Sequence, residues 1–210
     1  MGDAVDLHLH RWVPGATASA PVLVLLHGTG GNEDDLLSLG ATLAPGAALL
    51  SPRGNVLEQG APRFFRRLAE GVFDVDDLHR RSAQLGEFLT AAAERYRFDV
   101  ARTHAVGFSN GANIAASMLL SGGAPFAGAV LFRAMVPFEP ETPPSLADKH
   151  VLLSEGRADP LVPIATGERL AELFRAAGAE LELAWQAGGH GLVPNDVKLA
   201  RRWLGDRFAR

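Results

Sequence analysis

The chain has 210 residues, of which 47% are hydrophobic and 21% charged, with a formal net charge of −4. This length and composition predict one soluble globular domain over residues 1–210, and the lack of a basic excess argues against a nucleic-acid partner. There is no cysteine, which excludes disulfides, thiolate catalysis and cysteine-ligated zinc.

Apolar runs of strand length alternate along the chain with segments of helix length. The apolar runs predict strands, in chain order, at 21–28, 47–54, 103–108, 126–132, 149–156 and 180–186. The segments between them predict helices at 33–44, 74–97, 110–120 and 164–177, and Pro194 opens a last helix. Strands that are apolar on both faces and separated by helices predict an α/β fold. We expect a mostly parallel central sheet with helices on both faces and no large lid domain.

The first ten residues, MGDAVDLHLH, lack the basic start and apolar core of a secretory signal. No fully apolar run is long enough to span a membrane. We therefore expect a cytoplasmic protein. The segment HLH at 8–10 is interpreted as part of a further strand with His8 and His10 on one side of it. We expect these two histidines to be a surface pair on an edge strand rather than a metal site. We expect no metal and no cofactor.

Ser109 lies between a predicted strand and a predicted helix, in the pattern Gly107-Phe108-Ser109-Asn110-Gly111. At so sharp a junction, side chains two residues before and after the serine would collide with the neighbouring strand and helix, and glycine avoids the collision. The serine hydroxyl would then stand exposed at a helix N-terminus, which favours negative charge. The pattern predicts a nucleophile, with an ordinary serine helix cap as the alternative.

A serine nucleophile needs a general base, and the base needs an acid that orients it. His150 and His190 are the two histidines that follow Ser109. His150 lies inside a predicted strand, whereas His190 lies in a glycine-rich loop after the last strand, so we predict His190 as the base. For the acid we predict Asp159, which Pro160 keeps out of helical geometry in a loop after a strand. Glu155, in the same region, is the alternative acid.

Acyl transfer builds negative charge on an oxygen, which preorganised N–H donors must meet. One predicted donor is the backbone N–H of Asn110, directly after the serine. The other is the backbone N–H of Thr29, in the glycine-rich segment HGTGGNEDD at 27–35. That segment lacks the spacing and the lysine of a phosphate-binding P-loop. We expect His27 to brace the loop rather than to transfer protons.

Apolar residues of several loops are candidates for a substrate pocket, with plain core packing as the alternative for each. They are Phe64, Phe65, Phe73, Phe138, Leu161, Val162 and Leu192. Arg53, which follows a predicted strand, either faces the pocket or pairs with a carboxylate. If it faces the pocket, it would favour an anionic substrate. Arg66 and Arg67 are expected on a solvated face.

Several segments together resemble the α/β-hydrolase superfamily, and more narrowly its phospholipase/carboxylesterase family of small serine esterases. The segments are LLHGTGGNE, SPRG, PRFFRRLAEGVFD, GFSNGANIA, RAMVPFEP, GRADPLVP and GGHGL. The resemblance covers nearly the whole chain. It implies a triad of Ser109, Asp159 and His190, and oxyanion donors at Thr29 and Asn110.

The resemblance also implies hydrolysis of a small-molecule carboxylic ester, with a small to medium acyl group, through an acyl-enzyme. Thioesterase or lysophospholipase activity with the same triad is an alternative. Acyl-protein thioesterases of the family usually have glutamine where this chain has Asn110, and a bulky apolar residue where it has Thr29. A ligand-binding protein without turnover is the rival from another class, although such proteins typically lose the serine or the histidine. The sequence leaves the oligomeric state open, a homodimer included.

Overall fold

A seven-stranded sheet forms the centre of the computed structural model, which describes residues 4–209. The strand order is β1-β3-β2-β8-β9-β10-β11, and every neighbouring pair is parallel except the edge pair β1–β3. In that spatial order the strands span His10–Val13, Ala48–Pro52, Val22–Leu26, His104–Phe108, Gly128–Phe132, His150–Gly156 and Glu180–Gln186. The predicted mostly parallel sheet is confirmed. All residues of β2, β3 and β9 are buried, as expected for strands covered on both faces.

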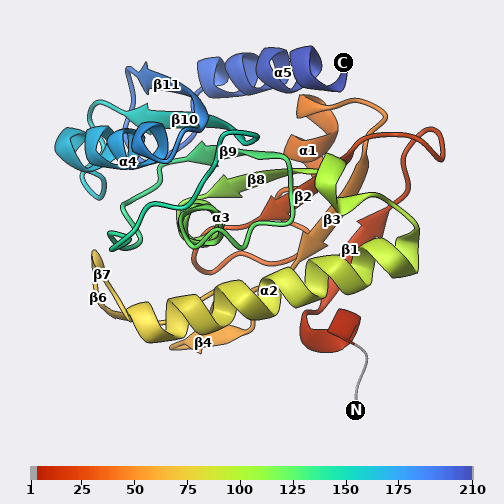
Figure 1. Cartoon of the computed structure of the whole chain (residues 1–210), viewed down its shortest axis with the longest axis horizontal. Coiled ribbons are helices and arrows are strands. Elements are labelled where there is room, and N and C mark those ends of the chain that lie inside the picture. The colour runs from red at the N-terminus through yellow and green to blue at the C-terminus, as the bar shows by residue number, and fades with distance from the viewer. Residues whose placement is uncertain (1–3, 210) are drawn as a thin grey trace.

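Helices cover both faces of the sheet, as predicted (Figure 1). They are α1 (Leu37–Leu43), α2 (Val75–Tyr96), α3 (Asn110–Leu120), α4 (Ile164–Ala176) and α5 (Pro194–Phe208), with the 3-10 turns η1 (Ala4–Leu7) and η2 (Val100–Arg102). The helices α2, α3 and α4 pack on one face, and α1 and α5 on the other. No large lid domain is present within residues 4–209, and none of the helices described there could cross a membrane.

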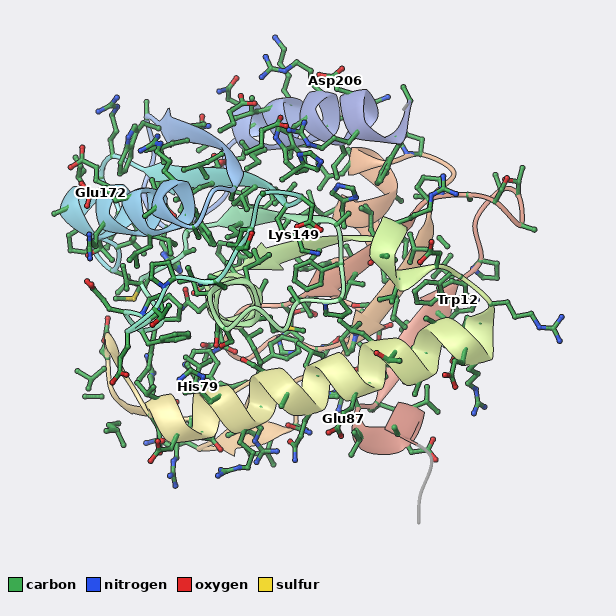
Figure 2. All side chains as sticks on the ribbon, viewed as in Figure 1. Trp12, His79, Glu87, Lys149, Glu172 and Asp206 are labelled. Atoms are coloured by element: carbon green, nitrogen blue, oxygen red, sulfur yellow. The ribbon has the colours of Figure 1, made fainter. Side chains whose placement is uncertain are left out.

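The longest helix, α2, shows how the chain builds this arrangement. Asp74 caps its N-terminus, because the carboxylate accepts a hydrogen bond of 3.0 Å from the backbone N–H of Asp77. Leu85 and Phe88 are fully buried on one side of the helix, while Glu87 is exposed and points away from the sheet (Figure 2). This amphipathic pattern fixes the face that α2 turns toward the sheet.

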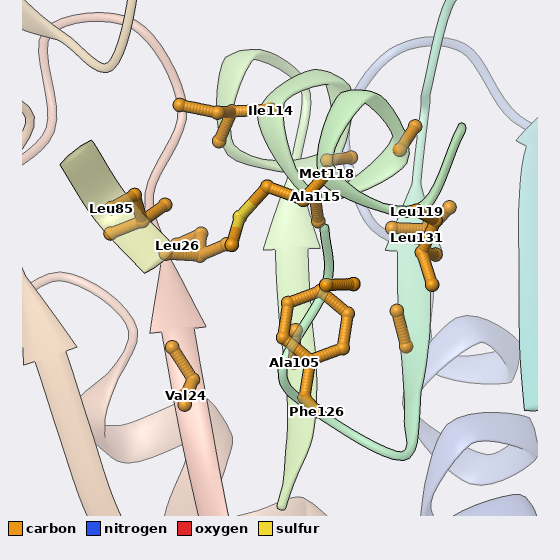
Figure 3. Close-up of a cluster of buried hydrophobic side chains, with 14 of the residues drawn as sticks. Val24, Leu26, Leu85, Ala105, Ile114, Ala115, Met118, Leu119, Phe126 and Leu131 are labelled. Carbon is orange, nitrogen blue, oxygen red and sulfur yellow. The ribbon is translucent and has the colours of Figure 1, made fainter. Parts of the chain in front are cut away.

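The larger core cluster fills the space between the sheet, α2 and α3 (Figure 3). Leu26 of β2 and Leu131 of β9 contribute to it from the sheet, and Leu85 and Met118 contribute from the helices. Full burial of one such side chain contributes about 1.5–3 kcal/mol to folding. The cluster thereby anchors α3, which begins directly after Ser109, against the sheet.

The structure corrects the predicted helix at 33–44, because α1 begins only at Leu37. The preceding residues form turns instead. The side chain of Asn32 accepts a hydrogen bond of 2.8 Å from the backbone N–H of Asp34. Glu33 forms a two-pronged ion pair with Arg53, with N–O distances of 2.5 and 2.8 Å. These contacts hold the residues before Leu37 out of a helix.

Two short hairpins between β3 and α2 were not predicted. The first pairs β4 (Val56–Glu58) with β5 (Ala61–Arg63), and the second pairs β6 (Arg67–Ala69) with β7 (Val72–Phe73). Gln59 and Gly60 turn the first hairpin with positive φ angles of 51° and 86°. Because these strands have two or three residues each, no run of alternating polarity is long enough to reveal them.

In the HLH segment His8 is buried and His10 is half-buried, which corrects the predicted surface pair. His10 does begin the edge strand β1, but its Nε2 lies 2.7 Å from the hydroxyl oxygen of Tyr96. His8 is 4% exposed, and its Nδ1 lies 2.8 Å from the carbonyl oxygen of Arg53. Both rings meet the edge of Phe88. Within residues 4–209, no group of three or more His, Cys, Asp or Glu side chains is arranged so that it could hold a metal ion.

Candidate active site

Ser109 occupies a strained turn between β8 and α3, with φ 52° and ψ −113°. A non-glycine residue rarely adopts a positive φ, and such strain is typical of functional sites. A Cβ atom on Gly107 would lie 2.7 Å from the backbone nitrogen of Ala112, and one on Gly111 would lie 2.0 Å from the carbonyl oxygen of Leu26. Both distances are far below van der Waals contact, so the predicted need for glycine at both positions is confirmed.

The structure brings His190 between Ser109 and Asp159. Nε2 of His190 lies 2.9 Å from Oγ of Ser109, and Nδ1 lies 2.8 Å from Oδ2 of Asp159. The other carboxylate oxygen of Asp159 accepts hydrogen bonds from the backbone N–H groups of Leu161 (2.8 Å) and Val162 (3.2 Å). Because a carboxylate only accepts, Nδ1 carries the ring proton, which leaves Nε2 to accept the serine proton.

Three different strands supply these three side chains. Ser109 follows β8, Asp159 follows β10, and His190 follows β11. Since these strands run parallel, their carboxyl ends meet at one edge of the sheet, and the arrowheads of β8 and β9 in Figure 1 point to the same side. Residues up to 81 positions apart are thereby hydrogen-bonded.

Glu155, the alternative acid, does not contact His190. It is fully buried near the end of β10, where Oε1 accepts a hydrogen bond of 2.9 Å from the backbone N–H of Ala134. Its Oε2 is buried without a hydrogen-bond partner among the described residues. Burial raises the pKa of this carboxyl well above its usual range. Glu155 is therefore a buried support beneath the edge of the sheet, in surroundings that disfavour its charged form.

A buried ion pair that sequence reasoning missed lies under the loop of His190. The guanidinium of Arg133 is fully buried and pairs with the buried carboxylate of Asp196, at 3.0 and 2.6 Å. Arg133 also donates to the carbonyl oxygens of Gly189 and Gly191, each at 2.9 Å. The pair thus holds the backbone on both sides of His190.

Further contacts fix this ion pair in the protein. Oδ1 of Asp196 accepts from the hydroxyl of Ser154, and Oδ2 accepts from the backbone N–H of Val193, at 2.7 and 2.8 Å. The second contact supports the first turn of α5. Arg133 directly follows β9 and has a positive φ of 57°. Its position after a parallel strand and its place at the start of the segment RAMVPFEP are the signals in the sequence that could have marked it as a site residue.

The two residues predicted to supply the oxyanion donors line the same cleft as the serine. Thr29, Asn110, Ser109 and His190 all line one small cleft with a volume of about 50 Å³. Asn110 is the first residue of α3, so its backbone N–H has no acceptor within the helix. Its side-chain oxygen accepts a hydrogen bond of 2.8 Å from the backbone N–H of Phe64, which fixes the residue in place.

His27 braces the loop of Thr29, as predicted. Its Nε2 accepts a hydrogen bond of 2.9 Å from the backbone N–H of Gly54, so its Nδ1 donates to the carbonyl oxygen of Gly28, 2.6 Å away. Burial lowers the pKa of His27. The ring is therefore neutral and occupied by two backbone contacts, which leaves it no part in proton transfer.

The candidate pocket residues divide into two groups. Phe73, Leu161 and Val162 line the cleft. Phe64 and Phe65 instead lie buried in the core, Phe138 packs against the larger core cluster, and Leu192 packs against the smaller one on the side of α1 and α5.

Among the arginines, Arg53 forms the ion pair with Glu33 and does not line the cleft, so the carboxylate-pairing alternative is correct. Arg66 is exposed, as predicted, whereas Arg67 lines the cleft and pairs with Glu58 at 2.7 Å. Arg63, which sequence reasoning did not single out, also lines the cleft.

Comparison with known proteins gives matches along nearly the whole chain. A sequence profile of the phospholipase/carboxylesterase family matches residues 10–205. MhqD of Bacillus subtilis (strain 168), which is named as a hydrolase, is 48% identical over 182 residues, or 87% of this chain and 91% of its own length. The crystal structure of the Bacillus cereus carboxylesterase has a TM-score of 0.91 and 46% identity, and the match covers 94% of this chain and 93% of that one. The structure of YahD with malic acid has a TM-score of 0.89 and 33% identity, covering 94% and 98%. The chain is thus an enzyme of the phospholipase/carboxylesterase family, with the α/β-hydrolase fold.

Proposed function

We propose that this protein is a carboxylesterase that uses Ser109 as nucleophile, His190 as general base and acid, and Asp159 as the orienting acid. The observation that carries the proposal is the unbroken chain of hydrogen bonds from Ser109 through His190 to Asp159, at 2.9 and 2.8 Å. The names of its relatives, a carboxylesterase and a hydrolase, support the same activity.

In the first step, Oγ of Ser109 attacks the ester carbonyl carbon while Nε2 of His190 takes the serine proton. Asp159 accepts from Nδ1 of the ring and stabilises the imidazolium that forms. The backbone N–H groups of Thr29 and Asn110 donate to the oxyanion. The C–O bond to the leaving alcohol then breaks, and His190 returns its proton to that alcohol. The acyl group remains on Ser109.

In the second step, a water molecule takes the place of the alcohol. His190 accepts a proton from the water as its oxygen attacks the acyl-enzyme, and the same two amides bind the second oxyanion. The bond to Oγ of Ser109 breaks, and His190 returns the proton to the serine. The products are the carboxylic acid and the free enzyme.

The cleft supports a substrate with a small acyl group. Its volume of about 50 Å³ is well below the roughly 300–1,000 Å³ of sites that enclose a drug-sized ligand. Apolar contacts come from Phe73, Leu161, Val162 and Met135, which line the wall. A long acyl chain would have to leave this space and lie on the surface near Leu161, which is 40% exposed.

We further propose that the enzyme acts in the cytoplasm on a diffusible small-molecule ester, without a nucleic-acid partner. The cysteine-free composition suits a reducing compartment, and the net charge of −4 provides no general attraction to nucleic acid. Cell fractionation with an antibody tests the location. Sedimentation tests whether the protein is a homodimer.

The direct test replaces Ser109 with alanine. We expect Ser109→Ala to lower kcat/KM for p-nitrophenyl acetate by about 10⁴-fold or more with the fold intact, because the nucleophile is lost. The matched control is Ser19→Ala, which removes an exposed serine hydroxyl far along the chain. A fluorophosphonate probe should label the wild type and the control but not Ser109→Ala. Near-wild-type hydrolysis by Ser109→Ala would reject the proposal, as would a wild type that is neither labelled nor active.

A panel of esters and thioesters of increasing acyl length, run on the wild type, distinguishes carboxylesterase from thioesterase and lysophospholipase activity.

A further inference from the structure

A buried arginine holds the side chain of Thr29 at the cleft. Nη1 of Arg63 lies 2.6 Å from Oγ1 of Thr29, and Nε lies 3.1 Å from the carbonyl oxygen of Phe65. The Arg63 side chain is only 3% exposed, whereas Thr29 is exposed, and both residues line the cleft that contains Ser109. Arg63 therefore approaches the cleft from the protein interior, and Thr29 lies between Arg63 and the solvent.

The chemistry of these two groups sets the direction of the hydroxyl proton. A guanidinium has only donors, so Oγ1 of Thr29 must be the acceptor in this contact. The hydroxyl proton of Thr29 therefore points away from Arg63 and is available to another acceptor. Among the hydrogen bonds of residues 4–209, this hydroxyl occurs only as the acceptor from Arg63. A positive charge on the accepting side also strengthens the donation from such a hydroxyl.

The position of Arg63 is costly for stability, which indicates a role beyond packing. A buried guanidinium loses its hydration, and its nearest carboxylate, on Glu58, lies 3.3 Å from Nε and is itself 32% exposed. Desolvation lowers the pKa of Arg63, so the surroundings do not fully compensate the charge. An apolar side chain of similar size would avoid this penalty but would leave Thr29 without its donor.

The loop of Thr29 is fixed by the same strand, β5. The backbone N–H of Gly30 donates to the carbonyl oxygen of Pro62 at 2.9 Å, directly before Arg63 in the chain. The β5 segment thus positions both the backbone of this loop and the side chain of Thr29. A hydroxyl and a backbone N–H of one residue, held in this way, can face one developing charge without reorganisation, which is what makes an oxyanion site effective.

We propose that the Thr29 hydroxyl donates a third hydrogen bond to the oxyanion, beside the backbone N–H groups of Thr29 and Asn110, and that Arg63 acts as a positioning residue for it. The inference rests on the proposed function, since it concerns the same oxyanion. No proton is transferred in this contact. The hydrogen bond strengthens as charge moves from the carbonyl π bond onto oxygen, and it weakens when the carbonyl re-forms.

The test compares Thr29→Val with Thr29→Ser on the neutral ester p-nitrophenyl acetate. Valine keeps the shape and the backbone N–H but removes the hydroxyl, so we expect kcat to fall by about 10²-fold with KM within about threefold, as for loss of one oxyanion donor. Serine retains the hydroxyl and should stay within about fivefold of the wild-type kcat. Thr17→Val, at an exposed threonine in the loop before β2, is the matched control and should not change kcat.

A double-mutant cycle tests the positioning role of Arg63. We expect Arg63→Met to lower kcat by about tenfold in the wild type but by less than about twofold in the Thr29→Val background, because its effect passes through the hydroxyl. A purely structural role would lower kcat equally in both backgrounds, and would overturn the assignment. So would a loss confined to esters that carry a carboxylate, which would make Arg63 a binding group for an anionic substrate instead. If Arg63→Met does not fold, Thr29→Val and Thr29→Ser still decide the hydroxyl's role.

The Ser109→Ala variant, measured beside these proteins, separates the two hypotheses. If Ser109 is essential and Thr29→Val has the wild-type kcat, or Thr29→Ser fails to restore it, only the third donor is rejected. If Ser109→Ala remains active, the proposed function itself is rejected.

Discussion

Two buried basic side chains, Arg133 and His104, lie at opposite ends of the central sheet and differ in how fully they are hydrogen-bonded. At the carboxyl end, Arg133 has hydrogen bonds to Asp196 and to the carbonyls of Gly189 and Gly191, with no exposed surface. At the amino end, His104 opens β8 with 5% exposure, and neither of its ring nitrogens has a hydrogen-bond partner among residues 4–209.

The difference in hydrogen bonding follows from the charge of each side chain at neutral pH. Burial lowers the pKa of His104 to about 4, so at neutral pH the ring is uncharged and packs edge-on against Trp203 and Phe208. Arg133 cannot give up its proton, and its pairing with Asp196 offsets the cost of burying that charge. The sheet thus keeps a fixed, fully paired charge at the end where His190 must be positioned, and a neutral ring at the other.

The largest expected effect at the carboxyl end is the loss of the proposed base. His190→Ala should lower kcat/KM by about 10⁴-fold or more, because no group is left to take the serine proton, and Asp159→Asn should lower it by about 10⁴-fold by favouring the wrong tautomer of the ring. Thermal unfolding monitored by circular dichroism shows whether the fold survives. His104→Leu, at the other end, should leave kcat/KM within about twofold. A large loss of activity in His104→Leu would contradict the separation of the two ends.

The next largest effect is the loss of stability when the ion pair of Arg133 and Asp196 is broken. Asp196→Leu should lower the free energy of unfolding by about 3–5 kcal/mol, because it leaves Arg133 buried and unpaired. The control Arg169→Met removes an exposed pair with Glu139 and should cost less than about 1 kcal/mol. Urea unfolding at pH 7 measures both changes.

A double replacement separates stability from positioning. Arg133→Met with Asp196→Leu should recover part of the lost stability, because two apolar groups can replace a buried ion pair. The kcat should nevertheless stay at least tenfold below the wild type, since nothing then holds the carbonyls of Gly189 and Gly191. A stable double variant with the wild-type kcat would show that the ion pair has no positioning role.

A smaller effect is expected on the pH dependence of stability at the carboxyl end. Glu155 is buried there, and one of its oxygens has no hydrogen-bond partner among residues 4–209. The pKa of Glu155 is raised in the folded state. The stability that its neutral form contributes is therefore fully present below the unfolded-state pKa. It is lost as pH rises from there through the folded-state pKa. Glu155→Gln keeps an acceptor for the backbone N–H of Ala134 but does not titrate. We expect its free energy of unfolding, relative to the wild type, to increase steadily with pH above about 4.5. Parallel curves at all pH values would contradict a buried neutral carboxyl.

The smallest effect is at the amino end and has the opposite sign. Because the pKa of His104 is lowered to about 4 from an unfolded value near 6.5, the stability linked to the neutral ring is present above 6.5 and is lost as pH falls through about 4. His104→Leu should therefore lose less stability than the wild type between pH 6.5 and pH 4. Unfolding measured at several pH values in this range checks the difference, and an unchanged acid transition would count against it.

Much of this site was predictable, because the signals are local. The apolar runs gave the order of strands and helices, and the elbow at Ser109 is marked by two glycines whose need is steric. Asp159 and His190 follow strands of a parallel sheet, whose carboxyl ends must meet at one edge. Each of these inferences needs only neighbouring residues and the geometry of a parallel sheet.

The rest depends on contacts that no local pattern encodes. The pairing of Arg133 with Asp196 joins residues 63 positions apart, and nothing in the sequence around either residue points to the other. Arg53 and Phe65 were candidates for the cleft, but the partner that removes Arg53 from it, Glu33, lies in a segment that was predicted as a helix. Arg63 reaches the cleft because it ends β5 of the unpredicted β4–β5 hairpin.

The steric demands at the elbow have an evolutionary consequence. A descendant that lost its chemistry could exchange Ser109 for glycine and so relax a φ of 52°, with the fold intact. It could not exchange Gly111 without pushing α3 away from the carbonyl of Leu26, which a Cβ would approach to 2.0 Å. In relatives without hydrolase activity, the two glycines should therefore be retained more often than the serine between them.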